Sequence, residues 1–159
     1  MEDSKESDTP IATTTKLDID EPGSSVDHKM YRGMIGSLLY FTTSRPDIVF
    51  SVSLCARFQE NLNESHLAVF KRILRYLKGT TDICLWYLKG SNFNLVGYVD
   101  INYAGFLVDR KSISCMAHFL GSCLVSWTTK KHTFVALSTT KVEYVAAASC
   151  CAQLLWIKQ

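Results

Sequence analysis

The spacing of apolar residues changes near residue 82, and this change limits the folds open to the chain more than any other feature. Before it, apolar side chains recur three or four residues apart, which is typical of helices. After it come short runs rich in Val, Ile, Tyr and Phe, bounded by Gly, Asn and Ser, which are typical of strands. The order predicts an α+β fold, in which a helical N-terminal segment is followed by an antiparallel sheet with one packed helix.

Three helices are predicted between residues 30 and 80. Ser44 can accept a hydrogen bond from the amide of Asp47 and so cap the second helix, with Pro46 in its first turn. Gly79 is expected to end the third helix in a left-handed conformation. The first helix is expected at about 30–42, the second from residue 44 onward, and the third at about 64–78. The apolar side chains of the third helix form one stripe, Leu67, Phe70, Leu74 and Leu77.

The second half contains strand-like runs at 83–88, 94–100, 113–120 and 123–128. A turn at 89–92 would join the first two into a hairpin, and Gly121-Ser122 suits a two-residue turn between the last two. A final helix is expected from Thr139 or Thr140 to the end. These runs predict a sheet of three or four strands.

Charge is distributed unevenly along the chain. Residues 1–30 hold three Lys against eight Asp or Glu, a balance of −5, and residues 1–29 are predicted to form an acidic flexible tether. Residues 31–159 hold fourteen Lys or Arg against seven acids, a balance of +7, which favours a nucleic-acid partner, although a solvated polar face is the alternative. The cations singled out for phosphate contacts are Lys71, Arg72, Arg75, Lys78, Arg110, Lys111, Lys130 and Lys131.

The N-terminus has neither the basic nor the apolar region of a secretory signal, and the longest nearly apolar stretch, 144–157, is 14 residues. That stretch is shorter than the roughly 18 residues that a membrane span needs. The chain is therefore expected to be intracellular, cytoplasmic or nuclear, with no membrane partner. The six cysteines show no Cys-x-x-Cys pair and are expected to be buried free thiols.

Several runs are specific enough to indicate a family. YRGMIGSLLY at 31–40, SRPDI at 44–48 and RYLKGT at 75–80 closely resemble the stretch that follows the reverse transcriptase palm in copia-type LTR-retrotransposon Pol polyproteins. GYVDINYAG at 97–105, DRKS at 109–112 and VALSTTKVEY at 135–144 resemble the start of the same polyprotein's ribonuclease H domain. The resemblance implies a helical reverse-transcriptase C-terminal segment at 30–80 and a truncated ribonuclease H-like domain at 81–159.

The resemblance also implies a metal site. Asp100 would be the central metal-bridging acid after the first strand, and Glu143, in the first turn of the last helix, a second ligand of Mg²⁺ or Mn²⁺. Two such ions would hydrolyse the RNA strand of an RNA–DNA hybrid. Each residue has a simpler interpretation, because Asp often forms turns and Thr140-x-x-Glu143 reads as a capping box.

The chain departs from the family pattern at this site. Asn102 and Lys141 stand where acids are usual, and the family's third and fourth metal carboxylates would lie beyond Gln159. Metal binding is therefore expected to be weak, and hydrolysis by this chain alone absent or very slow. The rest of the Pol polyprotein would be a partner. The alternatives are a non-catalytic nucleic-acid-binding module and a remnant without a selected function.

Overall fold

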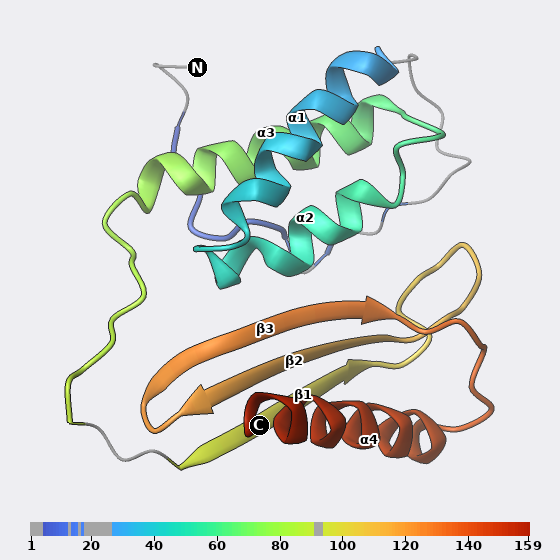
Figure 1. The fold of residues 1–159 in the computed structure, drawn as a ribbon. Helices are drawn as coiled ribbons and strands as arrows, with labels where there is room; N and C mark the ends of the chain where they lie inside the picture. Colours follow the sequence, from blue (N-terminus) through green and yellow to red (C-terminus); the bar gives the residue numbers. More distant parts are fainter. Residues whose placement is uncertain (1–4, 13, 16, 18–26, 91–93) are drawn as a thin grey trace. The chain divides into compact units, whose positions relative to one another are not determined.

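The computed structural model describes residues 5–12, 14–15, 17, 27–90 and 94–159 (Figure 1). The chain forms two compact units, Met1–Cys84 and Leu85–Gln159. The elements, in chain order, are α1 His28–Phe41, the short 3₁₀ helix η1 Pro46–Ile48, α2 Val49–Ala56, α3 Glu64–Gly79, β1 Leu95–Asn102, β2 Ile113–Leu120, β3 Cys123–Lys131 and α4 Thr139–Ile157. The predicted α+β class is confirmed, with the helices first and an antiparallel sheet carrying one helix after them.

The first unit is built from α1, α2 and α3, with α2 in contact with both of the others. Its core consists of fully buried side chains from all three helices and η1, among them Tyr31, Ile35, Ile48, Val52 and Ile73. Burial of such side chains contributes about 1.5–3 kcal/mol each and is the main force that holds short helices together. The ring of His66 stacks on Phe58 with centroids 4.4 Å apart.

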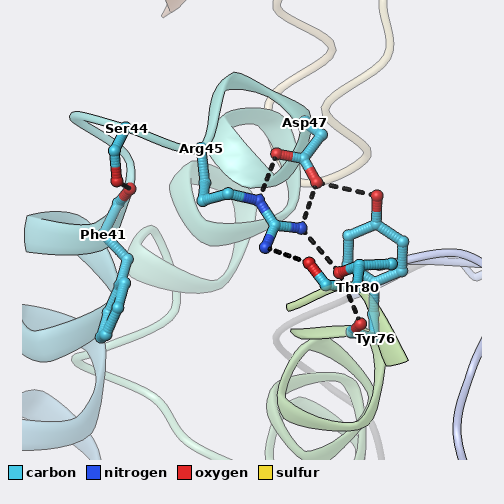
Figure 2. A network of polar contacts seen from close by, with 6 residues as sticks. All are labelled: Phe41, Ser44, Arg45, Asp47, Tyr76 and Thr80. Atoms are coloured by element: carbon cyan, nitrogen blue, oxygen red, sulfur yellow. Dashed lines mark hydrogen bonds and ion pairs between the residues drawn. The ribbon is translucent and has the colours of Figure 1, made fainter. Parts of the chain in front are cut away.

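Two of the predicted helix ends are wrong. The Ser44 hydroxyl donates to the carbonyl of Phe41 at 3.3 Å and caps nothing, so the second helix begins as η1 after Arg45 (Figure 2). Gly79 is the last residue of α3 and does not have a positive φ, and Thr80 is the C-cap. Both differences arise because Arg45 and Thr80 take part in one tertiary network, which overrides the local capping pattern.

The buried face of α3 also differs from the predicted stripe. Only Phe70 of the four predicted residues is fully buried, and the rest of the buried face is His66, Val69, Ile73 and Tyr76. His66 is buried because its ring accepts from the backbone of Asn63, forming a capping box. A hydropathy pattern does not count as part of the buried face a histidine or a tyrosine whose ring forms a hydrogen bond inside the protein, as His66 does with Asn63 and Tyr76 with Asp47.

The second unit is a three-stranded antiparallel sheet in the order β1-β2-β3, with α4 packed on β1 (Figure 1). The register aligns Asp100 with Cys115 and Thr129, and Asn102 with Ile113 and Lys131. Gly97 permits the helix to approach closely, because a Cβ at this position would lie 2.6 Å from Sγ of Cys150. β1 forms one edge of the described sheet.

The predicted hairpin between 83–88 and 94–100 is wrong. Residues 83–88 form no strand, and the hydroxyl of Tyr87 instead donates to the carbonyl of Leu124 at 3.1 Å. The run lacks the alternation of polar and apolar residues that a half-buried strand shows. Part of the predicted turn at 89–92 lies outside the described residues.

Two further expectations concern the cysteines and membranes. All six cysteines are free, but Cys84 and Cys151 are exposed, so burial was wrongly predicted for these two. No helix in the described part of the chain combines the length and apolar character that crossing a membrane requires.

Candidate nucleic-acid interface

The family-like runs of the second unit meet at one end of its sheet. Because the strands are antiparallel, β1 ends where β2 begins and where β3 ends, in the row Asn102, Ile113 and Lys131. The loop 103–112 and the segment 132–138 leading to α4 therefore leave the sheet at this same end. We call the four cations located here, Arg110, Lys111, Lys130 and Lys131, the basic end.

One carboxylate organises the basic end. Oδ2 of Asp109 lies 3.2 Å from Nζ of Lys111 and 3.0 Å from Nζ of Lys131, which also stands 4.1 Å from the ring centroid of Phe106. Burial alone would raise the pKa of Asp109, but hydrogen bonds from Lys131 and Lys111 outweigh it and hold this pKa below its ordinary value. Arg110 and Lys130 are exposed. The four cations of the basic end outnumber Asp109, the one acid with which two of them pair, and the exposed acids Asp100 and Glu143 lie on the neighbouring ends of β1 and α4.

The loop that carries Arg110 is held in a specific conformation. Arg110 and Ala104 have φ angles of 55° and 49°, which cost roughly 1–2 kcal/mol each in residues other than glycine. The Ser112 hydroxyl accepts from the amide of Ala104 at 3.1 Å. A Cβ on Gly105 would overlap the side chain of Asn102. The cations were predicted from the sequence, but the contacts that hold this loop were not. The one feature of the sequence that could have indicated a constrained loop is the glycine at 105.

Asp100 and Glu143 are both exposed. Asp100 lies in β1, two residues before Asn102, and Glu143 is the fifth residue of α4, in its second turn rather than its first. Ser138 caps α4 by accepting from the amide of Lys141 at 3.3 Å. Thr140 therefore lies inside the helix, and the capping-box interpretation of Glu143 is wrong.

The strand geometry limits how Asp100 and Glu143 can cooperate. Gly97 faces Cys150 and Leu154 of α4. Side chains alternate along a strand, so Asp100 lies on the opposite face of β1. A cation shared with Glu143 would have to sit around the open edge of β1 rather than between helix and sheet. Within the described residues, no three His, Cys, Asp or Glu side chains are grouped so that they could hold a metal ion, and the metal role of this pair stays a prediction.

The other predicted cations lie on α3, in the first unit. Lys71 and Lys78 are exposed, and Arg75 is half-buried. Arg72 is engaged by the N-terminal segment, since its Nε donates to the carbonyl of Thr9 at 3.1 Å and its Nη2 to the Thr9 hydroxyl at 2.9 Å. The eight predicted cations thus form two surfaces, one in each unit.

A polar network that the sequence did not reveal joins two of the family-like runs (Figure 2). Arg45 donates to both carboxylate oxygens of Asp47, at 3.0 and 2.7 Å, and to the carbonyl and hydroxyl of Thr80, at 2.9 and 2.7 Å. Tyr76 donates to Asp47 at 2.7 Å. Burial would raise the pKa of Asp47, but the hydrogen bonds from Arg45 and Tyr76 outweigh it and lower this pKa. The network fastens η1 to the end of α3.

Comparison with known proteins extends these observations. No family model and no solved structure matches the chain. It is 36% identical over 149 residues to the retrovirus-related Pol polyprotein from transposon RE1 of Arabidopsis thaliana, and 37% identical over 166 residues to that from transposon TNT 1-94 of Nicotiana tabacum. These alignments cover 94% and 100% of the chain but only 10% and 12% of the polyproteins.

A third relative is closer in length. The chain is 33% identical over 128 residues to the secreted RxLR effector protein 161 of Plasmopara viticola. This alignment covers 80% of the chain and 90% of that protein. The matches to the polyproteins extend over nearly the whole sequence and include both units. The chain belongs to the family of copia-type retrotransposon Pol polyproteins.

Proposed function

We propose that the Leu85–Gln159 unit binds RNA–DNA hybrid through its basic end, as the first part of a ribonuclease H domain. One observation carries the proposal: cations from two separate segments meet at the end of the sheet where β1, with Asp100, finishes and α4, with Glu143, starts. The proposal includes Asp100 and Glu143 as two of the ligands of Mg²⁺ or Mn²⁺. The remaining ligands would come from the rest of the Pol polyprotein.

Phosphate binding at the basic end is physically reasonable. Each phosphate neutralised by Lys or Arg releases counterions, so affinity falls as salt rises, with a logarithmic slope of about −2 to −4 for two to four contacts. Arg110 and Lys130 are exposed and can reach phosphates directly. Lys111 and Lys131 lie 3.2 and 3.0 Å from Asp109 and would exchange that carboxylate for the backbone of a nucleic acid.

We expect the Arg110→Ala/Lys130→Ala double variant to bind RNA–DNA hybrid about tenfold more weakly, because two exposed phosphate contacts are lost. The slope of affinity against salt should fall by about 2. Fluorescence anisotropy with a labelled hybrid, repeated at several salt concentrations, measures both quantities.

The matched control is Lys89→Ala/Lys158→Ala, which removes the same charge from exposed positions away from the basic end. Lys158 lies beside Leu95 and Leu120, at the opposite end of the sheet. The control should change affinity by less than about threefold, since only the net charge differs. Equal weakening by the two double variants would mean that overall charge, and not the basic end, attracts the nucleic acid.

The chain by itself is expected to leave the RNA strand uncut in Mg²⁺. Two carboxylates from the protein leave most coordination positions to water, whereas two-ion hydrolysis needs both ions held firmly. Electrophoresis of a hybrid with a labelled RNA strand tests this. Mg²⁺-dependent cleavage that disappears in Asp100→Asn and in Glu143→Gln would show instead that the chain already holds a working site.

A further inference from the structure

Part of the acidic N-terminal segment runs along α3. Thr9 binds Arg72, and Glu6 lies against Gly79, where a Cβ would be 3.2 Å from the Cβ of Glu6. Arg72 and Gly79 are two helical turns apart, roughly 10 Å along the helix axis. Three residues of chain span at most about the same 10 Å. Residues 6–9, which we call the strap, therefore run from Gly79 toward Arg72, opposite to the direction of α3, and the backbone bends at Asp8 and Thr9.

The strap lies on the basic face of α3. Arg75 lies close to the line from Arg72 to Gly79, because it is three residues from the first and four from the second. Lys71 and Lys78 are each one residue from an end of this line and lie roughly a quarter turn to one side of it. The strap itself contains two acids, Glu6 and Asp8. A side chain at position 79 would displace Glu6 by a few tenths of an ångström. The contact with the strap is therefore a reason for a glycine in the last turn of this helix.

The bonds that hold the strap are of a kind that a phosphate can replace. Within the part of the chain that the structure describes, the Arg72 guanidinium donates to the carbonyl and the hydroxyl of Thr9, which are both neutral acceptors. A phosphate would offer a charge-assisted, bidentate pair, which is roughly twice as strong. The strap carboxylates would repel an approaching phosphate until they move away.

We propose that α3 is a second nucleic-acid surface and that the strap is its intramolecular competitor. The basic face binds the phosphate backbone of a nucleic acid only after residues 6–9 have left it. This inference rests on the proposed function in one respect, namely that the chain binds nucleic acid. It concerns the Met1–Cys84 unit and residues that are not part of the basic end.

A reversible lock tests the competition. Glu6→Cys and Gly79→Cys would place two Cβ atoms about 3.2 Å apart, close to the roughly 3.5–4.5 Å found in disulfides. The pair is introduced into a Cys84→Ser/Cys151→Ser background, because these two native thiols are exposed. Hybrid affinity, measured by anisotropy, is expected to be at least threefold weaker in the oxidised than in the reduced protein. The control, Glu6→Cys alone in the same background, should not respond to the reductant.

A second pair of variants needs no crosslink. Glu6→Gln/Asp8→Asn removes the strap charges, and Glu60→Gln/Asp82→Asn removes the same charge from exposed acids elsewhere in the unit. The strap variant should bind hybrid at least threefold more tightly than its matched control.

Two sets of results would overturn the inference. If oxidised and reduced proteins bind equally and the two charge variants match, the strap does not compete, and the binding at the basic end is unaffected. If neither state binds hybrid at all, both this inference and the proposed function fail.

Discussion

Replacing Arg45 with Ala is expected to lower the free energy of unfolding of the Met1–Cys84 unit by about 3 kcal/mol, as in other cases where one partner of a buried ion pair is removed. The Arg45 side chain is only 11% exposed and its partner Asp47 25%. The substitution leaves the Asp47 carboxylate without its cation and Thr80 without two hydrogen bonds. Thermal unfolding followed by circular dichroism should show a melting temperature lower by roughly 15 °C for a unit of this size.

Arg32→Ala is the matched control, because Arg32 is exposed on α1, and it should change stability by no more than about 0.5 kcal/mol. Tyr76→Phe removes one hydrogen bond to Asp47 and should cost about 1 kcal/mol. If Arg45→Ala unfolds at the same temperature as Arg32→Ala, the network does not stabilise the unit.

The pH profile provides an independent check of the same network. The pKa of Asp47 is lower in the folded state than its ordinary value of 3.8. The folded state therefore holds this proton less tightly, and the resulting stabilisation is present above pH 3.8 and lost as the pH falls through the folded pKa. Asp47→Asn should remove this part of the acid sensitivity, because an amide does not titrate.

The network also shows where sequence reasoning stops. Arg45 and Thr80 are separated by 35 positions, and no local pattern indicates that the two will meet. The local pattern at 44–47 indicated a helix cap, which is a sound inference when the helix start has no other partners. The buried guanidinium of Arg45 can donate to several acceptors at once. These hydrogen bonds together outweigh the single capping bond that was predicted for Ser44.

Elements with a long and regular pattern were predicted well. α3 begins and ends within one residue of the expected positions, α4 begins where expected and ends two residues before Gln159, and β2 matches its predicted run. The run at 83–88 misled because its composition is that of a strand but it has no alternating face and no pairing partner in the sheet. β propensity describes how well a residue fits a pleated surface, and such a surface must exist for it to matter.

The candidate site was predictable in its residues but not in its arrangement. The family-like runs predicted Asp100 and Glu143, and the distribution of charge predicted the cations of the basic end; their functional roles stay predictions. Which face of β1 receives α4 depends on where a small residue permits close approach, and this is decided by Gly97 and its neighbours in space. The spacing between β1 and α4 therefore controls how the two carboxylates stand relative to one another.

Gly97→Ala is accordingly expected to destabilise the Leu85–Gln159 unit by about 2 kcal/mol, in the range typical of an overfilled core. The new methyl group would stand 2.6 Å from Sγ of Cys150, 3.0 Å from Leu154 and 3.2 Å from His118. α4 must move away from β1 to relieve these contacts, because the strand is fixed by its pairing with β2. Urea unfolding, with the fluorescence of Trp127 in β3 as the probe, measures the loss.

A compensating substitution distinguishes a clash from a general effect of losing glycine. Cys150→Ala removes the sulfur that the new methyl group would meet, and by itself should cost about 1 kcal/mol for the space it leaves. The Gly97→Ala/Cys150→Ala double variant should be more stable than the sum of the single effects predicts, by about 1 kcal/mol, because each change supplies the volume that the other requires. Strict additivity would mean that the contact between β1 and α4 is looser than 2.6 Å implies, and that the position of Glu143 does not depend on it.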